Sequence, residues 1–257
     1  MLGATGEFPH FSIEDRQRLA ETIIAGTRLP VMVNVSHSSL DGALELAQAA
    51  KQAGAAALLL MPPYFYRYGE PETGEFLRRF AAAAPAGIPR FLYNIPFFTS
   101  PIPIELALDL LRSQAYAGIK DSSGDWQSMS RLLEVRETAT IVVGNDSIFT
   151  RARSDGAHGS ISGVACALPE LVGALDAAIC SGDTARQQTL DARLHEFIAW
   201  IDTMPVPVGI RLALAARGAA PGEHPVPFSR ETAARAAAFR AWFSSWWPAV
   251  QLEIDQH

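Results

Sequence analysis

Two residues near the middle of the chain, Tyr93 and Lys120, stand at the ends of predicted strands, where a lysine can do imine chemistry. Tyr93 lies in the apolar run FLYNI, which Pro96 ends because proline cannot donate a hydrogen bond to a strand ladder. Lys120 follows the apolar run YAGI and precedes the polar turn DSSG, so it falls at the carboxyl end of a predicted strand. A lysine partly removed from water can lose its proton, and its neutral amine attacks ketones. The strand-end setting therefore makes Lys120 a candidate nucleophile, with Tyr93 expected close to it.

The segment between the two strands, residues 104–111, has apolar residues at helical spacing. A strand, a helix and a second strand in this order form a crossover whose two strands are parallel neighbours. In a β/α barrel, polar side chains at the carboxyl ends of such strands line the active site. We therefore expect Tyr93 and Lys120 to lie side by side at that edge. The spacing alone equally allows a solvated strand-end lysine and a half-buried aromatic residue.

Four short motifs occur in order along the chain: GATGE from Gly3, PPYF from Pro62, LYNIP from Leu92 and GIKDSSG from Gly118. Together they resemble the dihydrodipicolinate synthase/N-acetylneuraminate lyase family of class I aldolases, in which a lysine forms a Schiff base with the substrate. The resemblance extends from Gly3 to about Phe228, nearly the whole chain. It implies a TIM-type β/α barrel with a C-terminal helical region, no cofactor, and a lyase that acts on pyruvate or another 2-oxo acid.

The resemblance also implies roles for individual residues. Lys120 would be the Schiff-base nucleophile, and Tyr93 would be the phenol that moves protons near the reacting carbon. In the GATGE loop, the Thr5 hydroxyl and the backbone N–H groups of Ala4 and Thr5 would bind the substrate carboxylate. Standing alone, such a loop would more simply be an ordinary glycine turn.

Two further residues, Gly144 and Ile161, match family positions whose backbone lines the pocket around the lysine. Judged by residue type alone, they are ordinary strand-end residues. Both are therefore expected to contribute to substrate binding only because of the resemblance.

Three positions depart from the synthase pattern. Where the synthase has a hydroxyl residue that relays protons to the tyrosine, this chain has Ala4. Where the synthase has a tyrosine that reaches across a subunit contact, this chain has Phe65. Where the synthase has an arginine that binds the carboxylate of the incoming aldehyde, this chain has Phe98. Together with Phe97, Phe98 makes the distal pocket apolar. Burying a carboxylate against such a pocket costs several kcal/mol. The sequence thus favours a 2-oxo acid with an uncharged or apolar distal part over 4-hydroxy-tetrahydrodipicolinate synthesis.

Other functions remain open at this point. A dehydratase that removes water from a 2-oxo-3-deoxy sugar acid would use the same imine chemistry, as 4-hydroxy-tetrahydrodipicolinate synthase does. The alternative from a different class is a catalytically inactive barrel with a binding role, suggested by Ala4 and by the strand count.

Apolar strands alternate with helices along the chain, which is the pattern of a parallel α/β protein. Strands are expected to begin at Pro30, Ala55, Arg90, Ala115, Thr140 and Ala157, the last of them over 159–163. Helices are expected over 13–25, 40–53, 71–83, 104–111, 125–135, 170–180, 183–203, 206–217 and 229–246.

The strand count predicts an incomplete barrel. Relative to the family, the first strand, the first helix and most of the second strand are expected to be missing, which would leave an open seam. We expect the seam to be covered by a neighbouring chain, or the N-terminal loop to be displaced from the pocket. The predicted divisions are an incomplete barrel over 1–181 and a helical region over 182–257.

Composition limits the partners. The 257 residues carry a net charge of −6, which argues against a nucleic-acid or anionic-membrane partner, and no apolar run is long enough to span a bilayer. The two cysteines form no CxxC pair and fit a reducing cytoplasm. The six histidines show no HxH or HExxH spacing, so we expect no metal site.

Two aspartates and an aromatic loop complete the expectations. Asp121 and Asp146 stand at strand ends and are interpreted as loop caps rather than magnesium ligands. The resemblance implies a homo-oligomer, a dimer of dimers, with Phe65 and Tyr66 near a subunit contact.

Overall fold

The computed structural model describes residues 1–255, and the last two residues, Gln256 and His257, lie outside the described part. These residues pack as two compact units, one made of 1–145 with 155–159 and the other of 146–154 with the described residues from 160 onward. The expected division at residue 181 into barrel and helical region stays a prediction.

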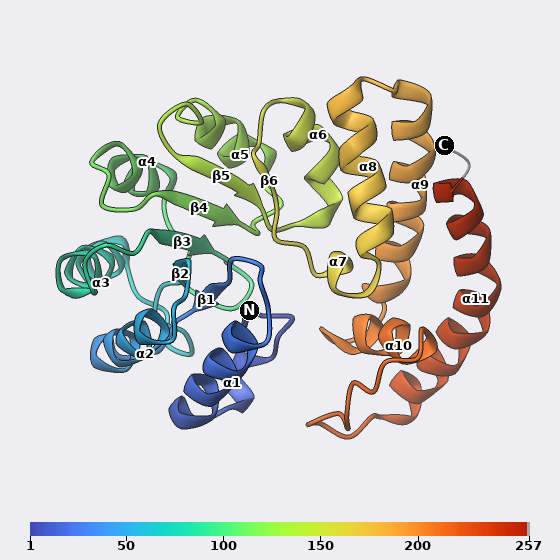
Figure 1. The fold of residues 1–257 in the computed structure, drawn as a ribbon, viewed down its shortest axis with the longest axis horizontal. Coiled ribbons are helices and arrows are strands. Elements are labelled where there is room, and N and C mark those ends of the chain that lie inside the picture. The colour runs from blue at the N-terminus through green and yellow to red at the C-terminus, as the bar shows by residue number, and fades with distance from the viewer. Residues whose placement is uncertain (256–257) are drawn as a thin grey trace. The chain divides into compact units, whose positions relative to one another are not determined.

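The first unit is built on a sheet whose strands follow one another in chain order, as Figure 1 shows. The strands are β1 (Met32–Asn34), β2 (Ala57–Leu60), β3 (Arg90–Asn94), β4 (Gly118–Asp121), β5 (Thr140–Val143) and β6 (Gly159–Ser160). The pairs from β1 to β5 are parallel. Six strands in this order confirm the expected parallel α/β architecture over the described residues.

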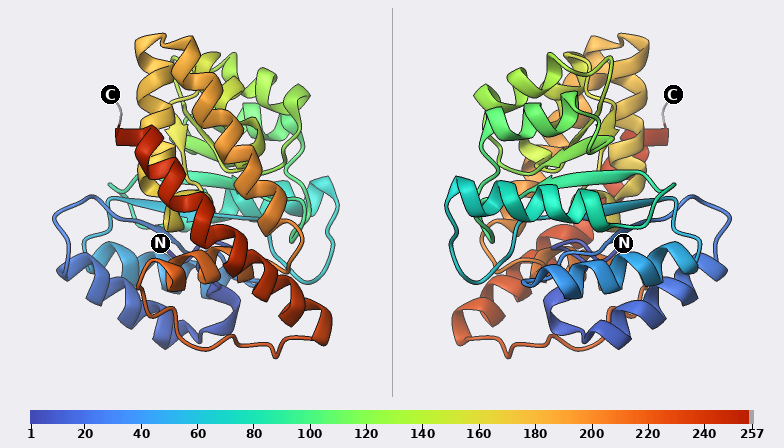
Figure 2. Two further views of the ribbon diagram at one scale, coloured as in Figure 1. Left: turned by 90° about the vertical axis from the view of Figure 1, so that its right-hand side faces the viewer. Right: turned by 90° about the vertical axis from the view of Figure 1, so that its left-hand side faces the viewer.

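The helices of the first unit alternate with these strands. They are η1 (Phe8–His10), α1 (Ile13–Ala25), α2 (Leu40–Gln52), α3 (Glu70–Ala83), α4 (Ile104–Arg112) and α5 (Trp126–Leu133). Seen from the left-hand side of Figure 1, α2 and α3 lie in front of the strands (Figure 2). The expected N-cap Ser12 is confirmed, because its side chain accepts a hydrogen bond from the Asp15 N–H at the start of α1.

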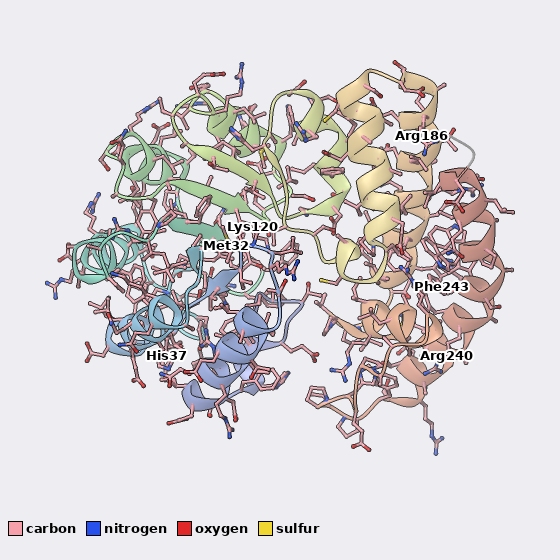
Figure 3. All side chains as sticks on the ribbon, in the orientation of Figure 1. Met32, His37, Lys120, Arg186, Arg240 and Phe243 are labelled. Carbon is pink, nitrogen blue, oxygen red and sulfur yellow. The ribbon has the colours of Figure 1, made fainter. Side chains whose placement is uncertain are left out.

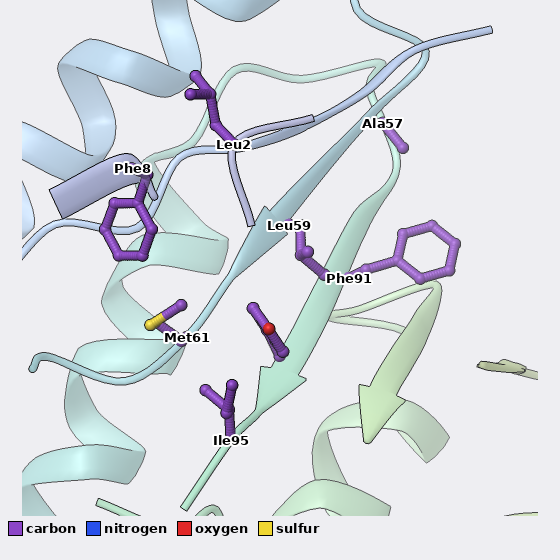
Figure 4. Close-up of a cluster of buried hydrophobic side chains, with 8 residues drawn as sticks. Leu2, Phe8, Ala57, Leu59, Met61, Phe91 and Ile95 are labelled. Atoms are coloured by element: carbon purple, nitrogen blue, oxygen red, sulfur yellow. The ribbon is translucent and has the colours of Figure 1, made fainter. Parts of the chain in front are cut away.

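One face of the sheet carries the buried core that positions the site. Figure 4 shows this cluster, in which residues two apart on β2 and β3 point to the same side. Its members are Leu2, Phe8, Ala57, Leu59, Met61, Phe91, Tyr93 and Ile95. Tyr93 therefore belongs to the same face as the N-terminal Leu2 and Phe8.

The N-terminal residues pair with the free edge of β1. The Met1 amine donates to the Met32 carbonyl at 2.5 Å, and the Asn34 N–H donates to the Met1 carbonyl at 3.1 Å. One residue bonded to two alternate residues of its neighbour is the pattern of a parallel pair. The displacement of the N-terminal loop that we expected is not observed, since a Cβ placed on Gly3 would lie 4.0 Å from the Lys120 Nζ.

The second unit is helical. Its elements are η2 (Asp146–Ile148), α6 (Phe149–Ser154), α7 (Val164–Ala167), α8 (Pro169–Ser181), α9 (Thr184–Ile201), α10 (Val208–Ala216) and α11 (Arg230–Asp255). The short helices α6 and α7 were not expected. The strand expected over 159–163 is only two residues long, and beyond it the Ser162 hydroxyl accepts from the Ala165 N–H in the first turn of α7.

Helix α11 is longer than expected. It was predicted to end at Trp246, before Pro248, but it continues to Asp255. Proline removes one helical hydrogen bond, and burial on either side of it offsets that loss: Trp247 and Val250 are both buried. Phe197 of α9 also stacks on Trp246 of α11 with ring centroids 5.8 Å apart.

No helix within residues 1–255 combines the length and the hydropathy needed to cross a bilayer. Cys166 and Cys180 form no disulfide.

Candidate active site

The side chains of Lys120 and Tyr93 meet at the carboxyl ends of β4 and β3. The two residues are register partners in the parallel pair, and the Lys120 amine donates a hydrogen bond to the Tyr93 hydroxyl at 3.1 Å. Lys120 is 6% exposed and Tyr93 is 1% exposed. Figure 3 marks the position of Lys120 near the end of β4. The expected adjacency of this pair is confirmed, and the alternative of a solvated lysine beside a half-buried tyrosine is wrong.

The Lys120 amine packs against the face of the Tyr93 ring. Its Nζ lies 4.1 Å from the centroid of the Tyr93 ring, and it forms no ion pair with the residues that the structure describes. Lysines removed from water are the ones that can act as nucleophiles. The phenol lies close enough to exchange a proton with a group bound to the amine.

The GATGE loop lies beside this pair. Gly3 approaches the Lys120 amine, and Phe8, which follows the loop, is 3% exposed in the core beneath it. The loop closes with a hydrogen bond from the Glu7 N–H to the Ala4 carbonyl at 3.0 Å. Ala4 and Thr5 are both half-buried. The loop is thus near the expected nucleophile, while the roles of Ala4 and Thr5 in carboxylate binding stay predictions.

Gly144, just after β5, is packed against the lysine. A Cβ added to it would lie 2.0 Å from the Ser122 Oγ and 2.7 Å from the Lys120 Cε, so no side chain fits. Its N–H donates to the Asp121 carbonyl at 2.7 Å. Ile161 belongs to the second unit and is half-buried. The part that either residue plays in substrate binding stays a prediction.

A side chain that the sequence did not single out, Ser122, also lies next to the lysine. It is 8% exposed, and its Oγ has no hydrogen-bond partner among the described residues. Residues two apart on a strand share a face, so the spacing of Lys120 and Ser122 is the signal that could have identified it.

Asp121 occupies the opposite face of β4. Its carboxylate accepts hydrogen bonds from the Asn94 Nδ2 and the Ser123 Oγ, each at 2.6 Å, and the residue is fully buried. Burial raises the pKa of Asp121 above its ordinary value, against the opposing effect of these two donors. The interpretation of Asp121 as a loop cap agrees with the bond that it accepts from Ser123. It did not foresee the bond from Asn94 of the neighbouring strand β3. Asp146 accepts from the Val164 N–H at 3.3 Å, as expected of a cap.

A buried polar network supports the GATGE loop from below. The Arg16 guanidinium donates to the Asn34 and Ser36 carbonyls, each at 2.9 Å, although Arg16 is only 3% exposed. Desolvation lowers the pKa of Arg16 to about 10. Asn34 in turn donates from its side chain to the Leu2 carbonyl at 2.6 Å, immediately before the loop. An arginine four residues into a polar-faced helix gave no sequence signal for this role.

Exposed aromatic side chains stand on the two loops that follow β2 and β3. Phe65, Tyr66, Phe97 and Phe98 are 83%, 66%, 74% and 53% exposed in the single chain. Arg67 ties the two loops together by donating to the carbonyls of Pro96 and Thr99. Within residues 1–255, no group of three or more His, Cys, Asp or Glu side chains could hold a metal ion.

Comparison with known proteins identifies the relatives of this chain. The model of the dihydrodipicolinate synthetase family matches residues 1–239. A DapA-like lyase from Chloroflexus aurantiacus is 34% identical over 211 residues, which cover 79% of this chain and 70% of that protein. A 4-hydroxy-tetrahydrodipicolinate synthase from Methanoculleus marisnigri is 30% identical over 232 residues, covering 87% of this chain and 78% of that protein.

Solved structures agree with this assignment. Dihydrodipicolinate synthase from Bacteroides thetaiotaomicron has a TM-score of 0.83 and 26% identity, covering 95% of this chain and 85% of that one. YagE, an E. coli K12 prophage protein solved in complex with pyruvate, has a TM-score of 0.86 at 23% identity, covering 96% and 85% of the respective chains, and it supports the fold alone. The strands and helices described above match the β/α-barrel fold of these proteins. By both sequence and fold, the chain belongs to the dihydrodipicolinate synthetase family.

Proposed function

We propose that this chain is a Schiff-base-forming lyase that acts on pyruvate or another 2-oxo acid through Lys120. The observation that carries the proposal is the buried hydrogen bond of 3.1 Å between the Lys120 amine and the Tyr93 hydroxyl. Family membership supports it, because relatives of this chain are named as a DapA-like lyase and a 4-hydroxy-tetrahydrodipicolinate synthase.

The chemistry follows from these two groups. The neutral Lys120 amine attacks the keto carbon, and loss of water from the adduct gives an iminium ion. The iminium withdraws electrons, so either a proton leaves the neighbouring carbon or a carbon–carbon bond breaks with its electron pair passing to the nitrogen. Tyr93 lies within hydrogen-bond reach of the amine and would carry the proton in each direction. Water then releases the product and restores the amine.

The substrate carboxylate is assigned to the GATGE loop. We propose that the N–H groups of Ala4 and Thr5, with the Thr5 hydroxyl, bind it, and that the backbone at Gly144 and Ile161 lines the pocket. The closeness of Gly3 and Gly144 to Lys120 supports this placement for the loop and for the end of β5. Clustered N–H donors suit an anion.

The distal part of the substrate is proposed to be uncharged or apolar. Phe97 and Phe98 follow β3, and neither can pair with a carboxylate. This favours an aldolase for such a 2-oxo acid over a 4-hydroxy-tetrahydrodipicolinate synthase. A 2-oxo-3-deoxy sugar acid dehydratase uses the same imine and is the second candidate. The hypothesis of a catalytically inactive barrel is less favoured, because the Lys120 amine and the Tyr93 hydroxyl are in contact.

Borohydride trapping tests the proposal cleanly, since the chain has just two lysines, Lys51 and Lys120. Lys51 is exposed and bonded to the Ala86 carbonyl, so Lys51→Arg is the matched control. With pyruvate and borohydride, the wild type and K51R should gain one reduced pyruvyl group on the peptide that contains Lys120, and K120R should gain none there. Absence of that adduct from K51R would contradict Schiff-base chemistry. A panel of 2-oxo acids and aldehydes with charged and apolar distal groups then separates the candidate reactions.

We also propose that the chain forms a homo-oligomer, a dimer of dimers, through the loop that carries Phe65 and Tyr66. The high exposure of both aromatic rings in the single chain supports a covered surface there. A monomer in light scattering at micromolar concentration would contradict it.

A further inference from the structure

The residues that directly follow the Lys120–Tyr93 pair form a second pair on the other face of the sheet. Asn94 and Asp121 are register partners, just as Tyr93 and Lys120 are. The Asn94 Nδ2 donates to the Asp121 Oδ1 at 2.6 Å, and the two residues are 7% and 0% exposed. Successive side chains of a strand alternate between faces, so this buried bond lies directly behind the reactive one.

The Asn94–Asp121 bond is held from both sides. The Ser123 Oγ donates to the Asp121 Oδ2 at 2.6 Å, and the Ile102 N–H donates to the Asn94 Oδ1 at 3.0 Å. Both carboxylate oxygens of Asp121, and the amide oxygen and nitrogen of Asn94, thus form hydrogen bonds. Of their donors and acceptors, one amide hydrogen of Asn94 is left over. A bond to a buried carboxylate is stronger than one between neutral groups. A pair so fully oriented limits the relative motion of the two strand tips.

The Asn94–Asp121 bond lies where the backbone pairing between β3 and β4 ends. Pro96 stops the ladder of β3 two residues beyond Asn94, because proline has no N–H to donate. The last backbone bond between the strands runs from the Ser122 N–H to the Asn94 carbonyl at 2.8 Å. The side-chain bond between Asn94 and Asp121 therefore adds to this last backbone bond at the tips that carry the reactive pair.

We infer that Asp121 is a positioning residue: through Asn94 it holds the tips of β3 and β4 at the spacing that brings the Lys120 amine to the Tyr93 hydroxyl. The inference rests on the proposed Schiff-base chemistry. The Asp121 carboxylate faces away from the substrate side. Asp121 therefore affects the rate of imine formation through geometry, and binding of the substrate carboxylate to the GATGE loop is unchanged.

The test measures the rate of borohydride-trapped imine as a function of pyruvate concentration for D121A, N94A, the double variant and D121N. Rates are expressed per folded molecule, with the folded fraction taken from circular dichroism. D121A and N94A should each lower the rate at saturating pyruvate about tenfold or more, with little change in the half-saturating concentration. The double variant should be no slower than the slower single variant, because both single changes break one bond. D121N keeps an oxygen that can accept from Asn94 and should recover most of the rate.

Asp125→Ala is the control for lost stability. Its side chain caps α5 by accepting from the Gln127 and Ser128 N–H groups, and its removal should lower the melting temperature with the trapping rate unchanged. A wild type that traps no pyruvate on Lys120 would refute the proposed function itself. A wild type that traps pyruvate while N94A and D121A match its rate would overturn only the role of Asp121. Should D121A fail to fold, an N94A rate equal to that of the wild type has the same meaning.

Discussion

Replacing Gly144 by alanine should disturb Lys120 directly. The new Cβ would lie 2.0 Å from the Ser122 Oγ and 2.7 Å from the Lys120 Cε, against an ordinary contact distance of about 3.5 Å. The Ser122 hydroxyl must therefore move by roughly 1.5 Å and the lysine side chain by about 1 Å. Overpacking of this kind costs about 1–3 kcal/mol. For a chain of this size each 1 kcal/mol lowers the melting temperature by about 2–4 °C.

The effect on chemistry should exceed the effect on stability. The Lys120 amine is 3.1 Å from the Tyr93 hydroxyl, and a shift of about 1 Å in a reacting group can slow a reaction about a hundredfold. The assay is the rate of pyruvate-dependent borohydride trapping on Lys120, read by mass spectrometry beside a thermal melt. Two measurements on one sample separate a misplaced amine from an unfolded protein.

Gly173→Ala is the matched control. Gly173 lies inside α8 and is exposed, and a Cβ added there would meet no other atom within 4 Å. Alanine should therefore leave trapping unchanged and stabilise the helix by about 0.5–1 kcal/mol. A G144A protein that melts and traps like the wild type would refute the reasoning, because the crowding around Lys120 would then have no consequence.

Three further predictions follow from the buried polar groups. Tyr93→Phe should keep the fold but slow imine trapping at least about tenfold, since the phenol no longer carries the proton; an unchanged rate would contradict its role. Arg16→Met should destabilise the chain by about 2–4 kcal/mol in urea unfolding, because the Asn34 and Ser36 carbonyls lose their donors, whereas Arg16→Lys should cost less. Burial raises the folded-state pKa of Asp121, so the wild type should lose stability relative to D121N as pH rises from about 4 through that raised pKa. Parallel pH–stability curves for the two proteins would contradict this last expectation.

The order of the elements and the reactive pair can be predicted from the amino-acid sequence alone. Apolar strands alternating with amphipathic helices indicate a parallel sheet, because a short crossover helix leaves adjacent strands parallel. That rule, applied to the helix at 104–111, is enough to place Tyr93 beside Lys120, and the strand register confirms it. Local signals such as the Ser12 cap are equally predictable, since the donor and acceptor lie within one turn of chain.

The ends of elements were less predictable because tertiary burial overrides local preference. Pro248 is a helix breaker by residue type, but α11 continues through it, with Val250 fully buried beyond. Conversely, a strand was expected over 159–163, but it ends after two residues, and Ser162 accepts from the Ala165 N–H just ahead of α7.

The polar contacts around the site depend on the tertiary structure. Arg16 meets the Ser36 carbonyl across 20 residues of chain, and Asn94 meets Asp121 across 27. Whether a charged side chain is buried, and which group satisfies it, depends on the register and packing of elements distant in sequence, which periodicity does not encode. The amino-acid sequence therefore determines that the reactive groups are an amine and a phenol. The contacts that hold the Lys120 Nζ 3.1 Å from the Tyr93 hydroxyl arise from the packing of the strands.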